Sequence, residues 1–303
     1  DLCSQMSRCS CHGDFHLASP HRQDHRILTE LISYGRSQKG GLPRFTLTLV
    51  VCRMENKEYA ARHHKSEQPS EWLSAFMDAE DIEVWGVADL REFVTPKDDF
   101  GHGFPRAISF AIQMNPVVMA GIQHGPNDRY AKEYARVNAR INELAERLAI
   151  GIRDRGFRAL PLAASSRTDT VGIKGDFPHK TAATRAGLGW VGRHCQLVNS
   201  RLGPWLRLGT VFTDVDLPCG PPIEQGFCGK CDRCVVACPA GALTGATWAP
   251  GKSREEILDV RACDNWKKEH YFQYHGGHNC GICTAACPFG QKSFRRWQRR
   301  TSQ

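Results

Sequence analysis

The 303-residue sequence contains no apolar run approaching the roughly 20 residues that a membrane-spanning helix needs. Its first residues also lack the basic start, apolar middle and small-residue cleavage site of a secretory signal. These absences argue against a membrane or exported protein. We therefore expect a cytoplasmic protein with reduced cysteines and no membrane partner.

Long internal repeats are missing too, apart from one duplicated cysteine pattern. Its first copy, C-x2-C-x2-C-x3-C-P, begins at Cys228 and ends at Pro239. The second copy, from Cys280 to Pro288, repeats the last three ligands, and Cys263 is the candidate for the missing fourth. This spacing is typical of [4Fe–4S] clusters, which take one thiolate per iron. The eight predicted ligands are Cys228, Cys231, Cys234, Cys238, Cys263, Cys280, Cys283 and Cys287.

In bacterial two-cluster ferredoxins the last cysteine of each run binds the other cluster. We therefore predict two clusters with crossed ligands. Cluster I takes Cys228, Cys231, Cys234 and Cys287. Cluster II takes Cys263, Cys280, Cys283 and Cys238.

Two other uses of cysteine stay open at this point. Zinc also binds C-x2-C pairs, although its modules do not usually need the longer C-x2-C-x2-C-x3-C-P run. Disulfides suit small secreted domains, whereas this chain is long and shows no export signal. The spacing favours iron–sulfur clusters over both.

The composition, with 41% hydrophobic and 24% charged residues, is typical of a soluble globular protein. The formal net charge of +8 suggests nucleic acid as a partner, but it ignores the negative charge of thiolate-bound clusters. Part of the excess lies in a basic tail over residues 291–303. That tail is either a solvated end or a contact for RNA or an acidic electron donor.

Residues 1–71 differ from the rest of the chain. They begin with Asp1 and are rich in cysteine and histidine without the spacing of a regular zinc module. One short apolar run, residues 45–52, predicts a strand. We expect this segment to be a poorly ordered or non-native extension.

The following residues have the periodicities of a folded domain. We predict a short helix over 71–79 and strands over 83–88 and 107–114. Apolar residues at spacings of three and four predict a long helix over 129–155, ended by Gly156.

These elements indicate an α/β (α+β) protein of two domains. We expect an α/β domain over residues 72–220 and a ferredoxin-like domain with two [4Fe–4S] clusters over residues 221–290. The basic tail follows.

A glycine-rich run, Ala186-Gly-Leu-Gly-Trp-Val-Gly192, precedes the cysteines. Together with Leu208-Gly-Thr-Val-Phe-Thr-Asp214 and the two cysteine runs, it resembles the epoxyqueuosine reductase family. Leu258 to Cys263 is similar to that family's approach to its isolated ligand, and the resemblance covers residues 72–290.

The resemblance implies a cobalamin-dependent reductase, related to reductive dehalogenases. Its first domain would be of the cobalamin-binding type, with the corrinoid between that domain and the ferredoxin-like domain. Two [4Fe–4S] clusters would pass electrons to cobalt from an external flavodoxin or ferredoxin. The substrate would be a small molecule or borne on tRNA. The cofactor-binding residues implied are Ala186, Gly187, Leu188, Gly189, Trp190 and Gly192.

The sequence identifies the proton donor less clearly than the cluster ligands. The family carries an acid in an Asp-Ser segment, where this sequence has Ala164-Ser165-Ser166. Our candidates are Asp176, His179 and Tyr130, each of which also has an ordinary structural interpretation. The alternative to a reductase is a non-catalytic, ferredoxin-like electron-transfer protein.

Overall fold

The computed structural model describes residues 69–302. The predicted strand over 45–52 and most of the predicted extension lie outside the described residues. Residues 69–71 belong instead to the first described helix, α2 (Pro69–Ala79), which confirms the helix predicted from residue 71. No helix in the described part of the chain is both long and apolar enough to cross a membrane.

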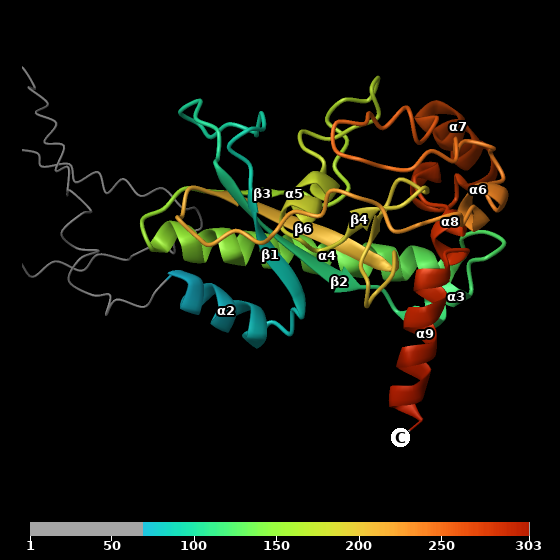
Figure 1. Cartoon of the computed structure of the whole chain (residues 1–303), viewed down its shortest axis with the longest axis horizontal. Coiled ribbons are helices and arrows are strands. Elements are labelled where there is room, and N and C mark those ends of the chain that lie inside the picture. The colour runs from blue at the N-terminus through green and yellow to red at the C-terminus, as the bar shows by residue number, and fades with distance from the viewer. Residues whose placement is uncertain (1–68, 303) are drawn as a thin grey trace, which may run out of the picture. The chain divides into compact units, whose positions relative to one another are not determined.

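A four-stranded sheet forms the centre of the fold (Figure 1). Its order is β1 (Val84–Asp89), β2 (Arg106–Gln113), β6 (Leu206–Thr213) and β3 (Ala159–Leu162). All neighbouring strands are antiparallel. The predicted strands over 83–88 and 107–114 are therefore confirmed to within one residue.

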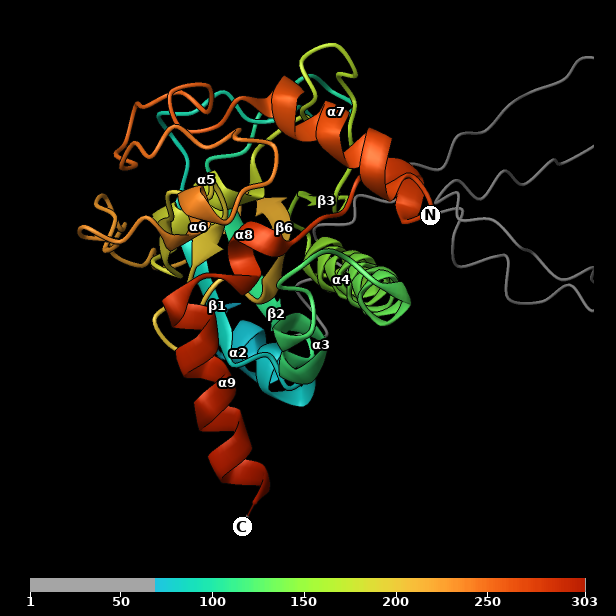
Figure 2. The same ribbon diagram turned by 90° about the vertical axis from the view of Figure 1, so that its right-hand side faces the viewer.

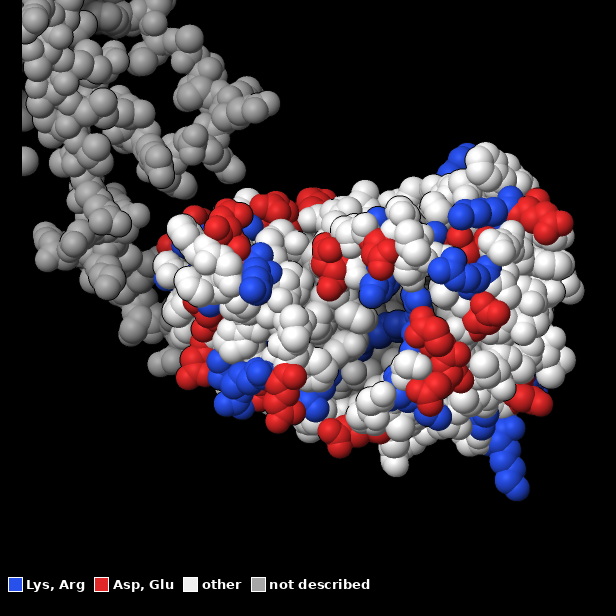
Figure 3. Space-filling model, turned by 90° about the horizontal axis from the view of Figure 1, so that it is seen from above, with Lys and Arg blue, Asp and Glu red and all other residues white. Residues whose placement is uncertain are grey.

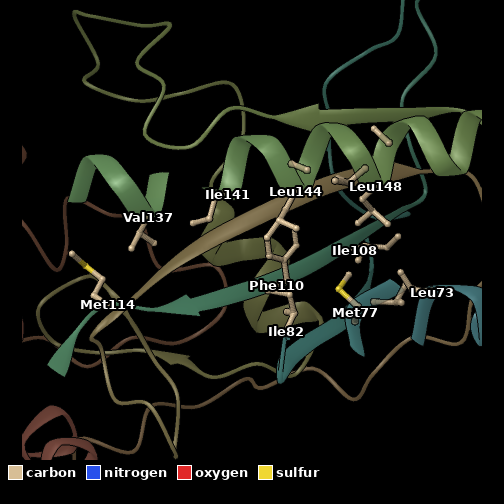
Figure 4. Close-up of a cluster of buried hydrophobic side chains, with 14 of the residues drawn as sticks. Leu73, Met77, Ile82, Ile108, Phe110, Met114, Val137, Ile141, Leu144 and Leu148 are labelled. Carbon is tan, nitrogen blue, oxygen red and sulfur yellow. The ribbon is translucent and has the colours of Figure 1, made fainter. Parts of the chain in front are cut away.

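Helices cover both faces of this sheet. Helix α4 (Asp128–Asp154) packs its apolar stripe against one face, together with α2. In Figure 4, Ile141, Leu144 and Leu148 of α4 point toward Phe110 of β2. Helix α5 (His179–Arg185) covers the opposite face, as the turned view in Figure 2 shows. Burial on both faces explains why β2 is apolar along most of its length.

The long helix predicted over 129–155 is confirmed as α4. The Asn127 side chain accepts a hydrogen bond from the Tyr130 backbone N–H and so caps its first turn. Gly156 follows the helix with a φ of 84°, a conformation that glycine adopts without steric cost.

A small hairpin between α5 and β6 contacts the cysteine region. It consists of β4 (Trp190–Val191) and β5 (Leu197–Val198). The indole N–H of Trp205, just before β6, donates a 2.9 Å hydrogen bond to the Thr284 carbonyl of the cysteine region. Trp205 and Ala285 of the cysteine region also belong to one cluster of buried apolar residues, so the two regions share a core.

The cysteine region contains short helices joined by loops. Helix α3 of the first domain also packs here, against the C-terminal helix. The bounds are α3 (Pro116–Ala120), α6 (Arg233–Val236), α7 (Val260–Tyr271), η1 (His275–Gly277), α8 (Ile282–Ala285) and α9 (Pro288–Thr301). Most of the predicted basic tail belongs to α9, which projects from the body in both Figure 1 and Figure 2. The predicted mixture of helices and strands is confirmed, while the boundary between residues 220 and 221 stays a prediction.

Candidate iron–sulfur and catalytic site

The cysteines predicted for cluster II surround one cavity. All four line a space of about 220 Å³, which we call the cluster cavity. Cys238 comes from the first run, directly after α6, whereas Cys280 and Cys283 flank the start of α8. Cys263 reaches the same cavity from α7. The structure therefore brings the isolated cysteine to the three others.

The remaining cysteines form the second group. The pKa of the Cys234 thiol is raised to about 11, mainly by burial and also by the neighbouring Cys287, Cys228 and Cys231. Cys287 thus lies with the first run although it belongs to the second. This grouping matches the crossed arrangement, while direct ligation stays a prediction.

Burial disfavours the thiolate form of these cysteines unless a metal is bound. Burial raises the pKa of Cys280 and of Cys287 to about 11 and raises that of Cys283 still more. Unliganded, they would be protonated at neutral pH, whereas the positive charge of iron stabilises their thiolates. Within residues 69–302 no three metal-binding side chains converge on a point suited to a single ion. The donor set fits iron–sulfur clusters.

A second cavity, also of about 220 Å³, adjoins the first. We call it the His179 cavity. The two cavities share Gln196, Pro204, Leu206 and Arg207 in their walls. In the space-filling view from above, the surface has a hollow with lysine and arginine side chains inside it (Figure 3).

His179 is held in its neutral form. Its Nε2 lies 3.3 Å from the Ala163 carbonyl, which only accepts hydrogen bonds, so Nε2 carries the proton. Its Nδ1 then accepts from the Thr210 hydroxyl at 2.8 Å. Burial lowers the pKa of His179 to about 4, and the positive Arg207 acts in the same direction. A neutral imidazole with both nitrogens engaged is a poor proton donor at pH 7.

His179 is expected to make folding stability depend on pH. As pH falls below 6.5 the unfolded chain binds a proton at this residue, whereas the folded chain does not until about pH 4. The free energy of unfolding should therefore fall by about 2 kcal/mol between pH 7.5 and pH 5 because of His179 alone. His179→Gln, which keeps the donor to Ala163, should lose that part of the dependence in paired denaturant titrations. Equal pH dependence in both proteins would contradict the prediction.

The other two predicted proton donors lie apart. Asp176 is exposed and lines the His179 cavity. Tyr130 is buried and lines the cluster cavity, where burial raises the pKa of its hydroxyl. The structure therefore brings Asp176 and His179 together but places Tyr130 in the adjoining space.

Tyr134 is the residue that sequence reasoning missed. Its hydroxyl lies 2.9 Å from the Ser165 hydroxyl, and the Arg207 guanidinium lies over its ring at 4.2 Å. Arg207 also donates hydrogen bonds to Ser165 and to Asn138. Burial raises the pKa of Tyr134, but the charge of Arg207 and the hydrogen bonds from Ser165 and Asn138 outweigh it, so the net pKa falls below its ordinary value.

Nothing local in the sequence marks Tyr134. It follows Tyr130 by one helical turn and has the same spacing as the core residues of α4. Its partners come from a loop and from β6, so only the tertiary fold joins them. Tyr134 and Arg207 both line the cluster cavity.

The glycine-rich run packs against the chain itself. A Cβ at Gly189 would lie 2.2 Å from the Val198 carbonyl oxygen, so this position has no room for a side chain. Trp190 lies edge-on between Phe227 and Phe289, at 5.1 and 5.0 Å between ring centroids. The predicted cofactor-binding residues, none of which lines either cavity, are Ala186, Gly187, Leu188, Gly189, Trp190 and Gly192. Their contact with a cofactor stays a prediction.

Comparison with known proteins decides what the cysteine region is. Residues 227–290 match the family described as "4Fe-4S double cluster binding domain". The region is a double [4Fe–4S] module. All the predicted cluster cysteines lie within this range, with Cys228 and Cys287 near its two ends.

The longer resemblance to epoxyqueuosine reductases is also confirmed. The chain is 27% identical over 211 residues to the epoxyqueuosine reductase of Pseudomonas aeruginosa, covering 62% of this chain and 52% of that protein. It is 33% identical over 119 residues to that of a Synechococcus species, covering 37% and 34%. The chain thus spans about half or less of the length of these curated relatives.

Solved structures show the same fold. A catabolic reductive dehalogenase, NpRdhA, matches with a TM-score of 0.58 and 21% identity, over 76% of this chain and 33% of that one. A selenomethionine-labelled epoxyqueuosine reductase matches with a TM-score of 0.51 and 15% identity, over 74% and 66%. At these identities the likeness concerns the fold alone.

Proposed function

We propose that this chain is the catalytic and electron-transfer part of a cobalamin-dependent iron–sulfur reductase related to epoxyqueuosine reductases. Its eight predicted cysteines would hold two clusters that take electrons from an external flavodoxin or ferredoxin. A corrinoid bound beside them would supply a cobalt centre for the transfer of low-potential electrons to a substrate. The chain itself positions the reactants and supplies a proton.

One observation carries this proposal. The four cysteines predicted for cluster II line the cluster cavity, and Tyr134 and Arg207 line the same cavity. An electron source and a proton source therefore open onto one space. A ferredoxin-like carrier, the alternative function, has no use for a proton donor beside its cluster. The cavity supports a reductase.

The lining of the two adjoining cavities fits a corrinoid. A corrin ring is a flat, largely apolar surface with amides around its edge. The His179 cavity offers aliphatic side chains such as Leu162, Leu197 and Leu208. Gln196, Ser165 and Ser166 offer hydrogen-bonding groups for the amides. We infer that these residues hold the cofactor.

Tyr134 is the proposed proton donor. Its lowered pKa eases loss of the phenolic proton, and Arg207 stabilises the tyrosinate that remains. Ser165 fixes the direction of the hydroxyl. Neutral His179 has a structural role instead. Its two hydrogen bonds join the Ala163 carbonyl to Thr210 of β6 and so hold the cavity wall in place.

The surroundings favour an anionic substrate. A further cavity of about 550 Å³ is lined by Lys174, Lys180, Lys252 and Arg254, and it shares Asp176 and Lys180 with the His179 cavity. Cations around an opening attract phosphates or carboxylates. Epoxyqueuosine, which the relatives' name gives, is the first compound to test, and we propose to present it on tRNA.

The deciding experiment is EPR spectroscopy of the protein after anaerobic reconstitution with iron and sulfide, with and without cob(II)alamin. We expect signals of reduced clusters and a cobalt spectrum that changes from base-on to base-off when the protein is added. Turnover of epoxyqueuosine tRNA would then be measured with a reduced flavodoxin. Cluster signals beside an unchanged cob(II)alamin spectrum would contradict the reductase and leave the electron carrier.

A further inference from the structure

Three side chains in the wall of the cluster cavity have buried polar atoms without hydrogen-bond partners. One is Trp266, through its indole Nε1, and the other two, Asn279 and His194, are almost completely buried. Asn279 is 2% exposed, and neither its Nδ2 nor its Oδ1 has a hydrogen-bond partner. His194 is 3% exposed, and its Nε2 has none. Both residues line the cavity that also contains Cys263, Cys280 and Cys283.

The unpartnered nitrogen of His194 is a hydrogen-bond donor. Its Nδ1 accepts a 3.2 Å hydrogen bond from the Gln196 backbone N–H and therefore carries no proton. The proton of the neutral ring must then be on Nε2. Burial keeps the ring neutral by lowering its pKa to about 4, and the nearby Lys180 contributes to that shift.

Leaving such donors unpaired is expensive. A buried polar group without a partner costs about 1–3 kcal/mol, and folded proteins contain few of them. Here His194 and Asn279, like Trp266, share a cavity with the four cysteines predicted for cluster II. The sulfur atoms of that cluster are acceptors that protein atoms alone do not provide.

The two donors come from different parts of the fold. Asn279 directly precedes Cys280 in the iron–sulfur module. His194 is at the tip of the β4–β5 hairpin, and the adjacent Arg193 anchors that tip to the module through a 2.8 Å hydrogen bond to the Gly229 carbonyl. Gly192 leaves room for the imidazole, since a Cβ there would lie 2.9 Å from its Cε1.

We propose that His194 Nε2–H and Asn279 Nδ2–H donate hydrogen bonds to sulfur atoms of cluster II and raise its reduction potential. Hydrogen bonds to cluster sulfurs stabilise the reduced state because it carries one more negative charge. The electron then rests beside the cavity that contains Tyr134. This inference rests on the electron-transfer function proposed above, but it does not depend on the corrinoid.

The test is an EPR-monitored redox titration of reconstituted protein. Asn279→Leu and His194→Leu should each lower the equilibrium constant for reduction of cluster II about tenfold, which is about 59 mV for a one-electron couple. His194→Gln keeps a side-chain N–H donor and should stay close to the unsubstituted protein. Cluster I is the internal control, and His102→Leu, at an exposed histidine with a weak contact to Asp98, is the matched control.

A second measurement does not depend on the leucine variants. In protein labelled with ¹⁵N-histidine, hyperfine spectroscopy of reduced cluster II should detect a coupled nitrogen that disappears in His194→Gln, which distinguishes His194 from His278 in the same cavity. An uncoupled nitrogen, or unchanged potentials in both leucine variants, would overturn the proposal. If a leucine variant does not load iron, the comparison of the nitrogen coupling between the unsubstituted protein and His194→Gln decides. Absence of every cluster signal from that protein would instead contradict the proposed function itself.

Discussion

Replacing Tyr134 with phenylalanine is expected to slow substrate reduction by about 10²–10⁴-fold, the usual contribution of a positioned proton donor. The substitution removes only the hydroxyl that lies 2.9 Å from Ser165. The ring beneath the Arg207 guanidinium remains, so the fold and the cavity should be preserved. Iron content and the cobalt EPR spectrum should therefore be unchanged while the rate of the chemical step falls.

Tyr130→Phe is the matched comparison. Tyr130 lines the same cavity one helical turn earlier, but burial raises the pKa of its hydroxyl. We expect the rate of substrate reduction to fall less than about tenfold in this variant, a much smaller effect than the loss of a proton donor would cause. Single-turnover reduction under anaerobic conditions would measure both rates. If the rate fell more in Tyr130→Phe than in Tyr134→Phe, Tyr130 would be the proton donor instead.

The pH profile gives an independent check on Tyr134. Its phenol must be protonated to donate, so the rate should fall as pH rises through its lowered pKa. Arg207 is part of the cause of that lowering, and Arg207→Leu should move the alkaline limb of the profile to higher pH. A limb that stays in place would show that another group titrates.

Replacing Cys263 with alanine is the second change with a large expected effect. If Cys263 is the fourth ligand of cluster II, iron content should fall from about eight to about four atoms per chain, because each cluster contains four irons. Reduction of substrate should be lost, since cluster II lines the cavity in which the reaction is proposed. Cluster I should keep its EPR signal.

Cys219→Ala is the control for that experiment. Cys219 is an exposed free thiol that belongs to neither cysteine run. Its replacement should leave iron content and both EPR signals unchanged. Full iron content in the Cys263→Ala protein would remove Cys263 from the ligand set and leave the isolated ligand unassigned.

Patterns along the chain were enough to predict the local elements and the kind of cofactor. The spacing of apolar residues placed α4 within a residue of its ends, because one helical face must be buried over its whole length. The cysteine spacing indicated two clusters, because consecutive thiolates must wrap around a compact group of irons. Both signals come from neighbours along the chain.

Which residues meet in the cavities depends on how the elements pack. Tyr134, Ser165 and Arg207 are far apart in the sequence, and only the packing of α4 beside β6 brings them together. The tertiary structure also gives the glycine-rich run contacts with the chain itself, as at Gly189 against Val198. Side-chain pKa values depend on burial and on charges brought close by folding, so no local pattern in the sequence distinguishes Tyr134 from Tyr130.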